Sequence, residues 1–113
     1  MPKRQDLELL RDIAEAVRRI ENYLKGISYQ KFSQDTKTQD AVVRNLEIIG
    51  EAVKNISTEF KKKHQQVEWA AIARMRDRLI HHYFGVNFEI VWDVVKEKLP
   101  ELKLQIQAIL NRG

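Results

Sequence analysis

The sequence contains no cysteine, only four glycines and two prolines, and no long apolar run. Without cysteine, neither a disulfide framework nor a thiolate metal site is available. No apolar stretch approaches the roughly 20 residues that span a bilayer, and no signal-peptide segment follows the first residues, so we expect a cytoplasmic protein without membrane contact. The scarcity of glycine and proline, together with 43% hydrophobic and 32% charged residues, favours a helical chain over a disordered or loop-rich one.

The length of 113 residues predicts a single domain over residues 1–113. The net charge is +4, because 20 basic residues outnumber 16 acidic ones. Contact with nucleic acid is compatible with this balance, but a modest excess spread along the chain does not require it.

Two long stretches carry apolar residues in steps of three and four, which is the spacing of an amphipathic helix. The first stretch begins near Asp6, ends near Gly26, and has the stripe Leu10, Ile13, Val17, Ile20, Leu24 and Ile27. The second has its N-cap at Asp35 or Thr36 and the stripe Val42, Leu46, Ile49, Val53, Ile56 and Phe60. Residues 28–37, which are polar and without period, are predicted to connect the two helices.

Gly50 lies inside the second predicted helix, where glycine costs about 1 kcal/mol relative to alanine. A close crossing with another helix would give that position a use. Residues 61–66 break the apolar pattern.

Three further helices are predicted beyond this break. The third runs from Trp69 to near Gly85, Asn87 caps a fourth, and Pro100 opens a short fifth in its first turn. The fold class is therefore all-α, a bundle of four to five helices.

Residues 74–83 gather three arginines, two histidines, an aspartate and a tyrosine within three helical turns. Such a cluster is costly to bury and repulsive on a solvated face, which favours a binding or catalytic use. Asp77 and His81 are four residues apart, so the carboxylate can fix the tautomer of the imidazole. Arg76 and His81, five apart, diverge by about 140° on a regular helix. A shared site therefore needs a distorted helix end or, as we prefer, a two-fold interface between two copies.

Arg76, His81 and Tyr83 form an Arg-x4-His-x-Tyr pattern that resembles the motif of HEPN-superfamily ribonucleases, in the form found in HepT toxins. Residues 40–52, 69, 75–81 and 91–102 are similar to the flanking segments of that family, and the resemblance covers about residues 6–110. His82 departs from the pattern, because a small or acidic residue is more usual there.

The resemblance implies a homodimeric, metal-independent endoribonuclease that needs no cofactor. His81 would act as general base on the ribose 2′-OH or as general acid on the leaving 5′-oxygen, and its counterpart in the second protomer would take the other role. Arg76 would hold the scissile phosphate. The expected products are a 2′,3′-cyclic phosphate and a 5′-hydroxyl, with Asp77, Arg78 and His82 as supporting residues.

Tyr83 is, by the same resemblance, the residue that a MntA-like minimal nucleotidyltransferase antitoxin AMPylates. The added bulk and negative charge beside Arg76 would keep RNA phosphate out.

The alternative function is a non-catalytic helical subunit that binds a nucleotidyltransferase and presents substrate or nucleotide to it, and a weaker alternative is a structural dimerisation module. Two side-chain interpretations stay open. Arg74 and Arg78 could contact phosphate or form ion pairs on the helix face, and Glu47 and Glu51 could line the cleft or belong to a structural network with Arg44.

Overall fold

The computed structural model describes residues 4–81 and 87–112, with positions 79–81 described by their backbone alone. All regular structure in these ranges is helical. In chain order the elements are α1 (Arg4–Leu24), α2 (Tyr29–Gln34), α3 (Thr36–Asn55), α4 (Thr58–Lys63), α5 (Trp69–His81), α6 (Phe88–Asp93), the π-helical turn η2 (Val94–Lys98) and α7 (Leu99–Arg112). The predicted all-α class is confirmed for these residues, although short helices join the four long ones.

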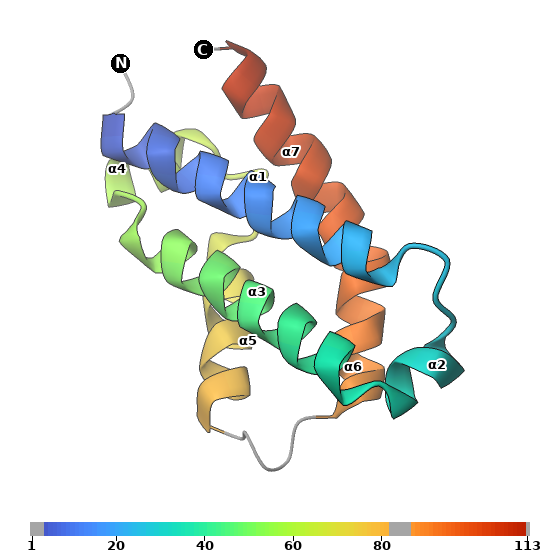
Figure 1. Cartoon of the computed structure of the whole chain (residues 1–113). Helices are drawn as coiled ribbons and strands as arrows, with labels where there is room; N and C mark the ends of the chain where they lie inside the picture. The colour runs from blue at the N-terminus through green and yellow to red at the C-terminus, as the bar shows by residue number, and fades with distance from the viewer. Residues whose placement is uncertain (1–3, 82–86, 113) are drawn as a thin grey trace.

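The long helices pack as a bundle with principal extents of 45 × 29 × 19 Å. Helix α1 packs along both α3 and α7, and α5 packs against the other side of α3 (Figure 1). Helix α3 therefore lies between α1 and α5 and is covered on two sides. Of the functional residues predicted from the sequence, Arg76, Asp77, Arg78 and His81 lie on α5, the helix on the outer side of this layer.

The predicted first helix is confirmed. Leu10, Ile13 and Ile20 are completely buried, and the stripe to which they belong faces α3 and α7. Gly26 follows the end of α1 with a φ of +74°, a left-handed conformation in which glycine has no Cβ penalty. The sequence position of this glycine therefore correctly marked the end of the helix.

The predicted connection at 28–37 is wrong in part, because it contains α2. Ser28 caps this short helix by accepting a hydrogen bond from Lys31 N at 3.2 Å. The helix buries Phe32 completely, and the Phe32 ring packs edge-on against Phe88 with ring centroids 6.1 Å apart. A single buried residue has no period, so the pattern gave no sign of α2. Asp35 then caps α3, as predicted.

The apolar stripe from Val42 to Phe60 does not form one helix. Helix α3 ends at Asn55, and the Ser57 hydroxyl caps α4 by accepting from Phe60 N at 3.2 Å. The buried Asp6 carboxylate accepts hydrogen bonds from Ser57 N at 2.8 Å and Ser57 Oγ at 2.7 Å, so a contact from α1 stabilises the break. The lysines at 61–63, predicted to interrupt the structure, instead complete α4.

The last predicted helices form one continuous helical run rather than two. Asn87 caps α6 as predicted, accepting from Glu89 N at 2.9 Å. Helix α6 continues through η2 directly into α7. Helix α7 has 14 residues, so the predicted short fifth helix is in fact long. Pro100 lacks an N–H group and would clash with the carbonyl four residues earlier in a regular α-helix. The widened turn, in which Leu99 N bonds to Val94 O, accommodates the proline without a break.

Candidate functional site

Helices α3 and α5 cross most closely at Gly50, inside α3. A Cβ atom added to Gly50 would overlap Cβ and Cγ of Arg76 and would lie 3.3 Å from its Cα. The crossing predicted from the interior glycine is therefore confirmed, and its partner is the motif arginine. Because no side chain separates the two backbones here, the stem of Arg76 rests directly on α3.

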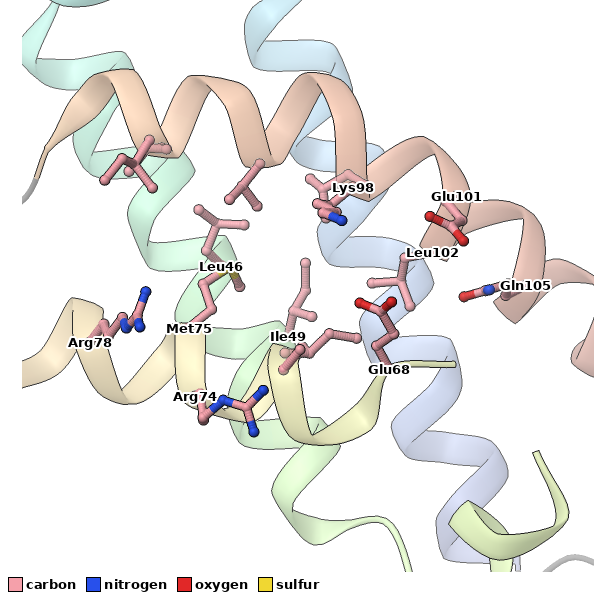
Figure 2. A pocket seen from close by; sticks show the side chains of 16 residues that line it. Leu46, Ile49, Glu68, Arg74, Met75, Arg78, Lys98, Glu101, Leu102 and Gln105 are labelled. Atoms are coloured by element: carbon pink, nitrogen blue, oxygen red, sulfur yellow. The ribbon is translucent and has the colours of Figure 1, made fainter. Parts of the chain in front are cut away.

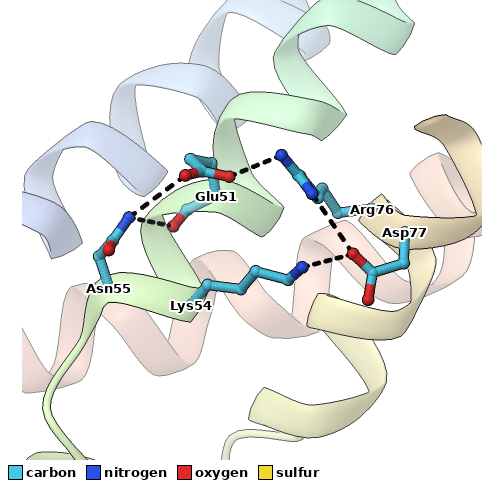
Figure 3. A network of polar contacts seen from close by, with 5 residues as sticks. All are labelled: Glu51, Lys54, Asn55, Arg76 and Asp77. Atoms are coloured by element: carbon cyan, nitrogen blue, oxygen red, sulfur yellow. Dashed lines mark hydrogen bonds and ion pairs between the residues drawn. The ribbon is translucent and has the colours of Figure 1, made fainter.

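The Arg76 side chain is 24% exposed and is held by two carboxylates. Its Nη2 lies 2.8 Å from Glu51 Oε2 on α3, and its Nη1 lies 3.4 Å from Asp77 Oδ1 on α5 (Figure 3). The Nε atom is buried and has no hydrogen-bond partner among the described residues. The guanidinium is thus clamped between the two helices with its stem desolvated.

Asp77 is the residue through which α5 makes a second link to α3. Lys54 Nζ lies 2.5 Å from Asp77 Oδ1, the same oxygen that receives Arg76 Nη1 (Figure 3). The hydrogen bond from Lys54 lowers the pKa of Asp77, and the Arg76 guanidinium adds to this effect, so the carboxylate stays ionised at neutral pH.

The sequence predicted that Asp77 would orient His81. In the structure, Asp77 Oδ1 accepts from Lys54 and Arg76. The side chain of His81 lies outside the described residues, so the predicted contact with Asp77 stays a prediction.

His81 ends α5 and is described by its backbone only, while His82 and Tyr83 lie outside the described residues. Because α5 is α-helical as far as His81, positions 76 and 81 keep the angular separation of about 140° expected for a regular helix.

A separate apolar groove of about 330 Å³ lies between α5 and the run from α6 to α7. Its lining includes Leu46, Met75 and Leu102, with Arg74 and Arg78 on its α5 side (Figure 2). Arg78 therefore belongs to this groove, whereas the Arg76 clamp is formed with α3. The described residues provide an ion-pair partner for neither Arg74 nor Arg78.

Sequence reasoning missed Lys54 and left Glu51 undecided. The sequence separation between Lys54 and Asp77 is 23 residues, and no periodic pattern relates two positions on different helices. Glu51 had one usable signal, because it directly follows the interior glycine that marks the crossing. Arg44, the proposed partner of Glu51, is exposed, and Arg76 takes that place.

The arrangement has the chemistry of an anion site. A guanidinium presents five N–H donors in a planar fork that matches phosphate geometry. Its position at the edge of a helix crossing leaves part of the fork open to solvent, while two of its nitrogens pair with carboxylates.

None of the described helices has both the length and the apolar character to cross a membrane.

Comparison with known proteins identifies the family of this chain. Residues 13–109 match the family described as "Ribonuclease HepT-like". A "Probable ribonuclease HepT" of Thermococcus cleftensis is 52% identical over 107 residues, covering 95% of this chain and 97% of that protein. A "Putative RNase" of Methanocaldococcus jannaschii is 46% identical over 111 residues, covering 98% and 92%. Another "Putative RNase", of Caldanaerobacter subterraneus, is 52% identical over 89 residues, covering 79% and 80%.

No solved structure gives a significant match to this chain. The family match covers most of the sequence, including the whole of α5 and the α3 segment that clamps Arg76. The chain belongs to the ribonuclease HepT-like family.

Proposed function

We propose that this chain is the toxin of a toxin–antitoxin pair, a metal-independent endoribonuclease with a composite active site at a homodimer interface. The observation that carries the proposal is the clamped Arg76, a half-buried guanidinium fixed at the crossing of α3 and α5 in a chain whose relatives are named as ribonucleases. A guanidinium in this setting suits a phosphate that gains charge during reaction.

The reaction is an in-line transesterification. His81 of one protomer removes the proton from the ribose 2′-OH, and the resulting oxygen attacks the phosphorus. The bond from phosphorus to the 5′-oxygen breaks, and His81 of the second protomer protonates that oxygen. Arg76 stabilises the charge on the phosphoryl oxygens. The products are a 2′,3′-cyclic phosphate and a 5′-hydroxyl, and every proton has a donor and an acceptor.

The helical geometry of α5 supports the proposed two-fold arrangement. Because this helix is regular as far as His81, a single copy places positions 76 and 81 about 140° apart around the axis. Two copies of α5 meeting across a two-fold axis supply an arginine from one copy and a histidine from the other. The net charge of +4 is compatible with binding of RNA at such an interface.

Neutralisation by a minimal nucleotidyltransferase completes the proposal. AMPylation of Tyr83 would add negative charge to a residue that follows Arg76 by seven positions in the sequence. An AMP-bearing tyrosine would then compete with RNA phosphate for the arginine.

The test uses purified protein without AMP on Tyr83, incubated with cellular RNA in EDTA. We expect cleavage with 2′,3′-cyclic phosphate ends, and a loss on the order of 10²–10³-fold in Arg76→Lys, because one transition-state donor set is removed. His81→Gln should abolish toxicity on expression, whereas Arg18→Lys, on an exposed part of α1, should retain it.

A protein that cleaves no RNA, and whose expression does not arrest growth, would favour the alternative of a non-catalytic subunit for a nucleotidyltransferase. Co-expression with that enzyme, followed by intact-mass measurement, tests the modification directly, because one or more AMP units should be added at Tyr83 and none in Tyr83→Phe.

A further inference from the structure

The motif arginine is anchored from outside its own helix. Glu51 Oε2 on α3 lies 2.8 Å from Arg76 Nη2, across the crossing at Gly50. We propose that Glu51 is a positioning residue of the ribonuclease, which fixes the Arg76 guanidinium in the orientation that receives the scissile phosphate. This inference rests on the proposed function and assigns a role to a residue outside the Arg-x4-His-x-Tyr motif.

Glu51 is itself supported in a way that suits this role. Asn55 Nδ2, one turn further along α3, donates to the Glu51 carbonyl at 3.0 Å and lies 3.5 Å from Glu51 Oε1. The amide thus steadies one carboxylate oxygen while the other oxygen receives Arg76 (Figure 3). The Glu51 side chain is 56% exposed, and an exposed carboxylate loses conformational freedom when it pairs with a cation, so the contact from Asn55 reduces that loss.

The hydrogen-bond inventory of Arg76 shows what remains for a ligand. A guanidinium has five N–H groups, one on Nε and two on each terminal nitrogen. The Nε group is buried, one Nη2 group is directed to Glu51, and one Nη1 group is directed to Asp77. One N–H remains on each terminal nitrogen, and this pair can bind two phosphate oxygens.

The charges around Arg76 favour orientation over simple attraction. Arg76 and Lys54 carry two positive charges, and Glu51 and Asp77 carry two negative charges, so the cluster is neutral overall. A site designed only to attract RNA would not place two carboxylates on its arginine. The cost in attraction is consistent with a gain in geometry, since misplacing a reacting group by about 1 Å can cost 10²-fold in rate.

Glu51→Gln separates these two effects. It keeps the length of the side chain and one acceptor oxygen, but it removes the charge that holds the guanidinium. We expect kcat to fall by ten- to a hundredfold, on the order of the loss for a misplaced group. KM should fall or stay unchanged, because the site gains positive charge toward RNA.

Glu47→Gln is the matched control. Glu47 lies one turn earlier on α3, is half-buried, and has no ion pair with another described residue. Its substitution makes the same charge change close to the crossing, so it should leave kcat unchanged. Thermal unfolding of both variants checks that they fold.

A double-mutant cycle with Arg76→Lys asks whether Glu51 acts through the arginine. Lysine cannot reproduce the planar fork, so an orienting partner loses its use. Glu51→Gln should therefore reduce kcat in the wild-type background and cause no further loss in Arg76→Lys. An unchanged kcat in Glu51→Gln, or losses that add independently of Arg76, would overturn the proposal.

A measurement independent of catalysis keeps this proposal apart from the proposed function. In ¹⁵N relaxation experiments, the Nε–H group of Arg76 should be well ordered in the wild type and in Glu47→Gln, and more mobile in Glu51→Gln. If the wild type cleaves no RNA, the proposed function fails while this result still supports the positioning role. Equal order of Arg76 in all three proteins would refute positioning, whatever the activity.

Discussion

The crossing at Gly50 gives the sharpest prediction about the fold and the site together. In Gly50→Ala, the new methyl group would overlap Cβ and Cγ of Arg76. These atoms lie next to the α5 backbone, so no rotation of a flexible side-chain end relieves the overlap. Helices α3 and α5 must instead move apart, and Arg76 moves with α5.

The magnitude follows from two opposing terms. Alanine is favoured over glycine inside a helix by about 1 kcal/mol. Overpacking a well-packed contact costs typically about 1–3 kcal/mol, and a clash with stem atoms lies at the upper end of that range. The expected net loss is therefore about 2 kcal/mol, which for a domain of this size lowers Tm by roughly 10 °C.

The assay is thermal and urea unfolding of four proteins that form a cycle: the wild type, Gly50→Ala, Arg76→Gly, and the double variant. Arg76→Gly removes the atoms that the new methyl group meets. In that background Gly50→Ala should therefore be neutral or stabilising, and the cycle should show a coupling energy of about 1–3 kcal/mol. A Gly50→Ala protein more stable than the wild type would refute the reasoning, because it would show that the helices do not touch here.

Two further predictions concern groups away from the site. Asp6→Ala should lower the free energy of unfolding by about 1–3 kcal/mol, because it leaves the Ser57 N–H without its acceptor. Urea unfolding should show no such loss in Asp12→Ala, where the aspartate is exposed. An equal loss in both variants would contradict this explanation. Burial, and then nearby positive charges, lower the pKa of His64 below its ordinary value of 6.5, so the folded state binds fewer protons than the unfolded state below that pH. The free energy of unfolding should therefore fall as pH drops from about 7 to about 5. His64→Gln should flatten this dependence, and an unchanged slope would exclude His64 as its cause.

Much of the fold was predictable because burial and period coincide along the chain. The α1 stripe, the Asp35 and Asn87 caps, and the Gly26 terminus are local signals, and each appears in the structure where the sequence placed it. The break at residues 56–57 was not predictable in this way. Ile56 and Phe60 continue the period and are buried, yet Ser57 begins a new helix because Asp6, 51 residues away, accepts its N–H.

In the candidate site, too, local features could be predicted from the sequence and contacts between helices could not. The sequence alone determined that Arg76 and His81 share one helix and that a regular helix separates them in angle, because these follow from local spacing. It also indicated a close helix crossing at Gly50, because glycine has no side chain to keep a neighbour away. Only the tertiary structure decided that the neighbour of Gly50 is Arg76 and that Arg76 pairs with Glu51 and Asp77. It also decided that Lys54 pairs with the same Asp77 oxygen. An ion pair between two helices depends on the rotation and depth of their packing, which the apolar residues of both helices set jointly and neither segment encodes by itself.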